Sequence, residues 1–196
     1  ADIVGMMTGG VRALLLQMLH PHALQGVLDH SNFREDLLGR LRRTGQFISA
    51  TTFGSHADAE RLIERVRRIH LSVTGTAPDG RAYAAYDPEL LTWVHVSEAY
   101  AFLQGFRAYA GMPGATGFDD RYYDESRRVA EALGARDVPA SSAAVVAYFE
   151  RVRPDLRFDA RSREVLAMLR RVRLPVPGAT FSREVFLGAG AALLPP

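Results

Sequence analysis

The stretch SHADAERLIERVRRIHLSV, residues 55–73, decides the fold class of this chain. Ser55, followed three residues later by Asp58, forms a capping box, which marks the start of a helix. Apolar residues then recur every three or four positions, a spacing that places them on one face of an α-helix. These positions are Ala59, Leu62, Ile63, Val66, Ile69 and Val73. The stretch therefore predicts an amphipathic helix with one apolar stripe.

Helical periodicity continues on both sides of this stretch. Upstream, we expect Gly9-Gly10 to open an apolar helix over 11–20 that Pro21 ends, and a short second helix to about residue 29. Ser31 or Asn32 is expected to cap a third helix, which carries Phe33 and closes at Gly54. Further helices are predicted over 88–110, 119–133, 141–151, 160–171 and 182–194.

The helical pattern breaks between residues 75 and 87. Pro78-Asp79-Gly80 is a turn sequence, and short extended segments at 72–76 and 81–86 can pair around it. The helix that follows is apolar on most faces, which predicts a central position. We find no repeat, low-complexity tract or domain linker. The sequence therefore predicts a single all-α domain over residues 1–196, with at most a small β-hairpin.

The composition excludes several kinds of site. The chain has no Cys, which excludes disulfides, thiolate zinc sites, iron–sulfur clusters and a thiolate-ligated haem. Its 24 basic residues are all Arg, which excludes a Schiff-base or P-loop lysine. A net charge of +2 is too small to indicate a nucleic-acid partner. No apolar run approaches the roughly 18 residues of a transmembrane helix, so we expect no such segment. The expected location is cytoplasmic.

The six His residues lack the partners found in common metal motifs. None has a Glu three residues before it, as di-iron bundles require, and no His-Glu-x-x-His sequence occurs. His70 is unusual because it lies on the apolar stripe of residues 55–73. A lone His in such a place is more often a core residue than a ligand. His20, His30 and His95 also lie in apolar contexts, and each taken alone is expected to be structural.

Arg40 and Thr44 lie one turn apart on the helix before this stretch. Burying Arg40 without a partner would be costly, so its guanidinium should meet an anion. A salt bridge to Asp36, or to another helix, is the simplest such anion. From these residues alone, the internal salt bridge is the favoured interpretation.

The order of short motifs along the whole chain carries more information than any one of them. They are Arg12-Ala-Leu-Leu-Leu-Gln17, His20-Pro21, Gly26-Val27, His30-Ser31, Arg40-x-x-x-Thr44, Thr52-Phe53-Gly54, Val66-Arg67-x-x-His70, Asp87-Pro88-x-Leu90-Leu91-x-Trp93-Val94-His95, Asp120-Arg121-Tyr122-Tyr123-x-Glu125 and Leu193-Leu194-Pro195-Pro196. The series resembles the MpaB-type, or rubber oxygenase (latex clearing protein), catalytic domain family. In that family the domain begins earlier and ends later, so we expect the chain to lack flanking family segments at both ends.

The resemblance implies a globin-like, all-α fold that holds haem b, with its iron, and uses O₂ on an apolar substrate. That substrate, a small molecule or a polymer, would be an isoprenoid or unsaturated lipid whose carbon–carbon double bond is cleaved or oxidised. By the same resemblance His70 is the iron ligand, its other ring nitrogen bonded to a carbonyl or carboxylate. His95 is the second choice, since it too lies on a central helix. The alternative function is a non-catalytic haem-binding sensor or carrier.

The resemblance also implies roles for nearby Arg and Thr residues. Arg40 and Thr44 match the family's distal side, and Arg40 could pair with a propionate or with bound oxygen. Arg67, one turn before His70, is a second candidate for a propionate. Arg43 replaces the Lys of the rubber-cleaving branch, and its high pKa prevents it from becoming a neutral ligand. That branch also uses a Glu base, but no Glu occurs between Gln17 and His30, which favours a substrate smaller than rubber.

Overall fold

The structure is a computed structural model that describes residues 3–31, 35–109, 117–171 and 187–192. Its helices are α1 (Ile3–Gln17), α2 (Pro21–His30), α3 (Leu37–Phe53), α4 (His56–Leu71), α5 (Pro88–Tyr109), α6 (Phe118–Leu133), α7 (Ser142–Val152), the short 3₁₀ helix η1 (Arg153–Asp155) and α8 (Ala160–Arg171). The strands β1 (Thr74–Thr76) and β2 (Ala82–Ala84) form an antiparallel pair. The predicted all-α fold with one small hairpin is confirmed.

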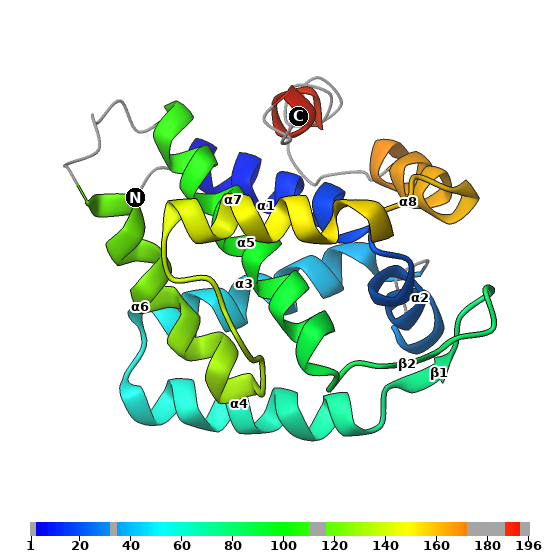
Figure 1. Cartoon of the computed structure of the whole chain (residues 1–196), viewed down its shortest axis with the longest axis horizontal. Coiled ribbons are helices and arrows are strands. Elements are labelled where there is room, and N and C mark those ends of the chain that lie inside the picture. Colours follow the sequence, from blue (N-terminus) through cyan, green and yellow to red (C-terminus); the bar gives the residue numbers. More distant parts are fainter. Residues whose placement is uncertain (1–2, 32–34, 110–116, 172–186, 193–196) are drawn as a thin grey trace.

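Helix α5 runs through the middle of the molecule, and α1 packs along it (Figure 1). Glycines allow the two helix backbones to approach closely. A Cβ atom added to Gly105 of α5 would lie 2.4 Å from the carbonyl oxygen of Gly5. A Cβ on Gly9 would lie 2.9 Å from the Cα of Phe102. The prediction that Gly9-Gly10 opens the first helix is therefore wrong. The two glycines lie inside α1, where they allow the close contact with α5.

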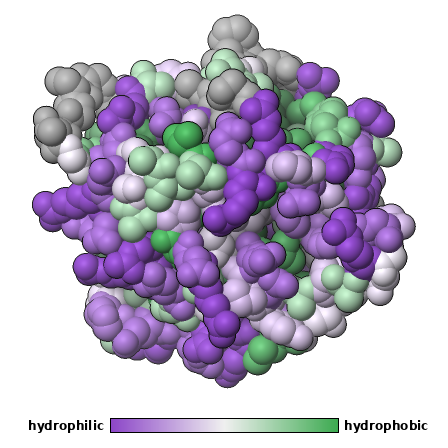
Figure 2. Space-filling view, in the orientation of Figure 1, coloured by the Kyte–Doolittle hydropathy of each residue, from purple (hydrophilic) through white to green (hydrophobic). Residues whose placement is uncertain are grey.

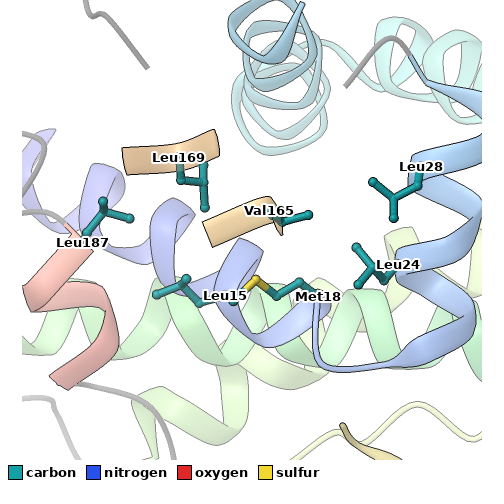
Figure 3. Close-up of a cluster of buried hydrophobic side chains, with 7 residues drawn as sticks. All are labelled: Leu15, Met18, Leu24, Leu28, Val165, Leu169 and Leu187. Carbon is teal, nitrogen blue, oxygen red and sulfur yellow. The ribbon is translucent and has the colours of Figure 1, made fainter. Parts of the chain in front are cut away.

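One core cluster joins the two ends of the chain (Figure 3). Its side chains come from α1 and the turn that follows it, from α2 and α8, and from the helical segment 187–192, and they point toward one another. They are Leu15, Met18, Leu24, Leu28, Val165, Leu169 and Leu187. The predicted last helix, 182–194, is observed over 187–192, and its remaining residues lie outside the described part of the chain.

A second core cluster surrounds Trp93 between α5, α6 and α7. Tyr100, Tyr123 and Tyr148 add aromatic side chains to it, and Phe149 packs edge-on against Trp93 at a centroid distance of 6.1 Å. The guanidinium of Arg12, which is 1% exposed, lies 4.3 Å from the centre of the Tyr100 ring. This cation–π contact brings the charge of α1 against an aromatic face instead of a carboxylate.

The third helix begins later than predicted. Asp36 caps α3, and its carboxylate accepts a hydrogen bond from the Gly39 amide at 2.8 Å. Ser31 instead ends α2, where its hydroxyl donates to the Val27 carbonyl at 2.6 Å. Asn32 and Phe33 lie outside the described residues. The start of α3 was predicted too early because Ser, Asn and Asp can all cap a helix, and the sequence offers one of each in this region.

Helix α4 starts as predicted, because the Ser55 hydroxyl accepts from the Asp58 amide at 3.2 Å. It contributes no fully buried side chain among the described residues.

The hairpin is held against α2, where Tyr83 donates to the Asp29 carboxylate at 2.5 Å. Polar side chains dominate the face shown in Figure 2. Within the described residues, no helix combines the length and apolar character that a membrane crossing needs.

Candidate functional site

Two cavities share one wall. The smaller, of about 270 Å³, is lined from α1, α2, α4, α5 and the hairpin, with Arg40 of α3 and Val165 of α8. The larger, of about 720 Å³, lies among α3, α4, α5 and α6 and has the size of a cofactor or small-molecule site. Five residues line both cavities and form the wall between them: Arg40, Ile69, His70, Leu91 and Val94.

The larger cavity is mainly apolar, with few polar groups. Phe47, Val66, Phe102 and Phe106 are among its apolar lining residues. Its ionisable side chains are Arg40, Arg43, His70, His95, Glu98 and Tyr122 in the described part of the chain. From the α4 stripe, Val66 and Ile69 line this cavity together with His70, and Ile69 is 52% exposed although it lies on the apolar face of the helix. An apolar cavity with a few placed polar groups is the usual form of a ligand site.

His70 presents a neutral imidazole at the wall between the cavities. Burial lowers the pKa of His70, and the nearby charge of Arg40 lowers it further. Its Nδ1 atom is buried and has no hydrogen-bond partner among the described residues. The expected bond from this second nitrogen to a carbonyl or carboxylate is therefore absent there. A neutral imidazole with a free ring nitrogen is the form that binds a metal ion.

Arg40 lies on the same wall, and its guanidinium has no ion pair with a described residue. Burial lowers the pKa of the Arg40 guanidinium, and the positive charge of Arg43 lowers it further. The expected salt bridge from Arg40 to Asp36 is wrong, because Asp36 pairs with Arg43 at 3.3 Å. No other described carboxylate is paired with Arg40. A half-buried guanidinium without an anion favours a negatively charged ligand in the cavity.

The remaining predicted Arg and Thr residues divide into two groups. Arg43 and Thr44 line the larger cavity, and the Thr44 hydroxyl donates to the Arg40 carbonyl at 3.2 Å. Arg67 lines neither cavity and lies 3.7 Å from the carboxylate of Glu64. The structure thus brings Arg40, Arg43, Thr44 and His70 together and does not bring Arg67 to them. A cofactor role for Arg67 stays a prediction from the resemblance.

His95 also lines the larger cavity, from α5. Burial lowers the pKa of His95 to about 4, partly offset by the negative charge of Glu131. His95 of α5 is therefore a second neutral imidazole that lines the same cavity as His70 of α4. His20 and His30 have structural partners instead. His20 Nδ1 caps α2 by accepting from the Ala23 amide at 3.4 Å, and His30 Nε2 donates to the Thr74 carbonyl at 2.9 Å.

The sequence analysis did not single out Glu98, the one acidic residue among the described residues that line the larger cavity. Burial raises the pKa of Glu98 to about 7, and its carboxyl has no hydrogen bond or ion pair with a described residue. The charge of Glu98 adds to burial in raising the pKa of Tyr122, which lies on α6. A signal was present in the sequence: a lone carboxylate in the interior of an apolar helix is unusual.

Comparison with known proteins agrees with the order of motifs along the chain. Residues 1–196 match the family described as the catalytic domain of the ER-bound oxygenase mpaB/B′ and rubber oxygenase. The chain belongs to this family. The resemblance seen in the sequence is therefore confirmed over the whole chain, and it places these cavities in a domain of oxygenase type.

The curated relatives of this oxygenase-family domain include two mycobacterial proteins, both described as uncharacterized, from Mycobacterium bovis and Mycobacterium tuberculosis. Each is 28% identical over 160 residues, which cover 78% of this chain and 62% of the relative. The matched part of the chain thus spans somewhat less than two thirds of their length. No solved structure matches the chain.

Proposed function

We propose that this chain is a haem b-dependent oxygenase domain that cleaves or oxidises a carbon–carbon double bond of an apolar isoprenoid or unsaturated lipid with O₂. The observation that carries the proposal is that His70 and Arg40 lie together on the wall of an apolar cavity, and that neither the His70 Nδ1 atom nor the Arg40 guanidinium has a partner among the described residues. Family membership supplies the reaction type at the level of an oxygenase.

The described residues fit the chemistry of haem b. Its macrocycle is flat and apolar and suits a cavity lined by Phe47, Phe102 and Phe106. Its two propionates are carboxylates, which the unpaired guanidinium of Arg40 would bind. Its iron needs a nitrogen ligand, and the absence of Cys leaves His70 as the first choice, with His95 as the second. Bound haem would supply the activation of O₂.

The residues of the chain would then bind and orient the reactants. The apolar lining would hold an apolar chain and keep water away from it. Thr44 sits one turn from Arg40 and would offer a hydroxyl toward the same cavity. Arg43 lines the same cavity and pairs with Asp36, so its guanidinium would contribute to the polar edge of the site and would not act as an iron ligand.

The ultraviolet–visible spectrum of the purified protein tests this proposal. We expect a Soret band in the wild type, or after addition of haemin, and its loss or shift in His70→Ala. His56→Ala is the matched control, because His56 is exposed at the start of α4 and lines neither cavity. A band that survives His70→Ala and disappears in His95→Ala would move the ligand to α5. A protein that takes up no haemin would overturn the proposal.

Oxygen uptake separates turnover from haem binding alone. With haem bound, the oxygenase consumes O₂ in the presence of an unsaturated lipid or isoprenoid, and product analysis shows oxidised or cleaved double bonds. Full haem occupancy without O₂ uptake across a panel of such lipids would favour the alternative, a haem-binding sensor or carrier. One observation favours that alternative: the chain has no Glu between Gln17 and His30, where the rubber-cleaving branch has its base.

A further inference from the structure

Glu98 places a carboxyl group in a wall that is otherwise mainly apolar. It lies in the middle of α5, three residues after His95 and four before Phe102, and all three line the larger cavity. This spacing puts them on one face of the helix. The side chain is half-buried, so it is held by the helix yet remains accessible from the cavity.

No described residue satisfies this carboxyl. It makes no hydrogen bond or ion pair with any of them, and the two cations of the cavity, Arg40 and Arg43, belong to α3. Burial without a neighbouring cation is the cause that raises the pKa of Glu98 to about 7. An unpartnered carboxyl in an apolar wall is costly, whereas a ligand that donates a hydrogen bond removes that cost.

We propose that Glu98 recognises a hydroxyl group on an otherwise apolar substrate, so that the cavity takes an alcohol in preference to the matching hydrocarbon or ether. This inference rests on the proposed function only in assuming that the substrate binds in the same cavity. The hydroxyl donates to the Glu98 carboxyl, and the Tyr122 phenol on the neighbouring helix is available to donate to the hydroxyl oxygen. Both residues then position one end of the substrate.

Other polar groups fit this cavity less well. An ammonium would be attracted by Glu98 but repelled by Arg40 in the same cavity, whereas the charge of Arg43 is already paired with Asp36. A carboxylate would be attracted by Arg40 and repelled by Glu98. A plain hydrocarbon would leave the Glu98 carboxyl unpartnered, and sites built to bond a hydroxyl reject analogues that lack it. A neutral group that donates a hydrogen bond satisfies the Glu98 carboxyl and is not repelled by the charge of Arg40.

Isothermal titration calorimetry with decanol, decyl methyl ether and decanoic acid tests this specificity. The titrations are made at pH 8.5, where the Glu98 carboxyl is ionised and can only accept. The ether has the same chain and oxygen but cannot donate a hydrogen bond. We expect wild-type protein to bind decanol roughly 10-fold or more tightly than the ether, the effect of one satisfied buried acceptor. Decanoic acid should also bind more weakly than decanol at this pH, because its carboxylate is repelled by the ionised Glu98. Equal affinities for alcohol and ether, or no binding of either, would overturn the inference.

Two variants locate the preference at Glu98. Glu98→Leu should abolish the preference while still binding the ether. Glu98→Gln should bind decanol but show a smaller preference than the wild type, because its amide accepts from the alcohol and also donates to the ether oxygen. Glu89→Leu is the matched control, since Glu89 is exposed in the first turn of the same helix and lines neither cavity. Circular dichroism establishes that each variant is folded. A preference that persists in Glu98→Leu would place the recognition elsewhere and refute the inference.

The titrations are made with haem-loaded and haem-free protein. Bound haem without an alcohol preference would refute the role of Glu98 and leave the proposed function standing. An alcohol preference in a protein that takes up no haem would support the role of Glu98 and refute the haem-dependent function. The two failures are therefore distinguishable.

Discussion

Arg40 and His70 lie on different helices, α3 and α4, yet both line both cavities, and the charge of Arg40 helps to lower the pKa of His70. Arg40 is a cation without an anion among the described residues, and His70 is an imidazole that burial and this charge keep neutral. Each feature is unfavourable or unremarkable alone. Together they suit a ligand that brings both a metal ion and a carboxylate, which is why the proposed cofactor fits this wall.

Arg40→Leu should therefore act on His70 as well as on haem binding. Removing the cation should raise the pKa of His70 toward its ordinary value of 6.5, although burial, the larger cause, keeps it lower. Haemin affinity should fall as well, because a propionate loses its partner. NMR titration of the His ring signals in haem-free protein measures the first effect, and haemin titration the second. Arg42→Leu, at an exposed position outside both cavities, is the control. An unchanged His70 titration would show that the two side chains do not interact.

His20 should make the protein less stable in acid. Burial lowers the pKa of His20 from 6.5 to about 4. Between these values the unfolded chain binds a proton that the folded chain does not, so the free energy of unfolding falls as the pH falls through this window. His20→Asn, which can still cap α2, should reduce this loss by on the order of 2 kcal/mol. Urea denaturation at a series of pH values measures it, with the exposed His56→Asn as control. Equal pH dependence in wild type and His20→Asn would contradict the prediction.

Glu98 should have the opposite pH dependence. Its pKa in the folded protein, about 7, lies above its ordinary value of 4.5. The folded chain therefore holds a proton in this window that the unfolded chain has lost, and stability declines as the pH rises from about 4.5 through about 7. Glu98→Gln should raise the free energy of unfolding above pH 7 by on the order of 2 kcal/mol and have little effect at the acid end. Glu89→Gln is the control. A stabilisation that is equal at all pH values would show that titration of Glu98 is not its cause.

The contact between α1 and α5 should depend on Gly105. An added Cβ would meet the Gly5 carbonyl oxygen at 2.4 Å, and a backbone atom cannot move aside as a side chain can. Gly105→Ala should destabilise the protein by about 3 kcal/mol, in the range of severe overpacking. Gly45→Ala is the matched control, because a Cβ there meets nothing within 4 Å. In the helix α3 that change should stabilise by about 0.5–1 kcal/mol. Thermal and urea denaturation measure both, and similar effects at the two positions would refute the close-contact explanation.

Local sequence patterns predicted most of the helices well because their signals lie within a few residues. Ser55 and Asp58 start α4 as expected, and Pro88 begins α5 at the predicted residue. The start of α3 was misplaced because Ser31, Asn32 and Asp36 can all cap a helix, and only the completed turn selects Asp36. Gly9-Gly10 was read as a helix start because glycine is a poor helix former, but its role is set by α5, which lies far away in the sequence.

The sequence by itself determined the all-α fold class, the absence of thiolate chemistry and the family, because these depend on composition, periodicity and the order of motifs. It also singled out His70 and Arg40. Only the tertiary structure decided that these two residues share one wall, that Arg67 lies away from it, and that Glu98 faces the same cavity. The physical reason is that a cavity is formed by several helices at once. Which side chains face it, and which of them lack partners, depends on how distant segments pack together, and no local pattern encodes that arrangement.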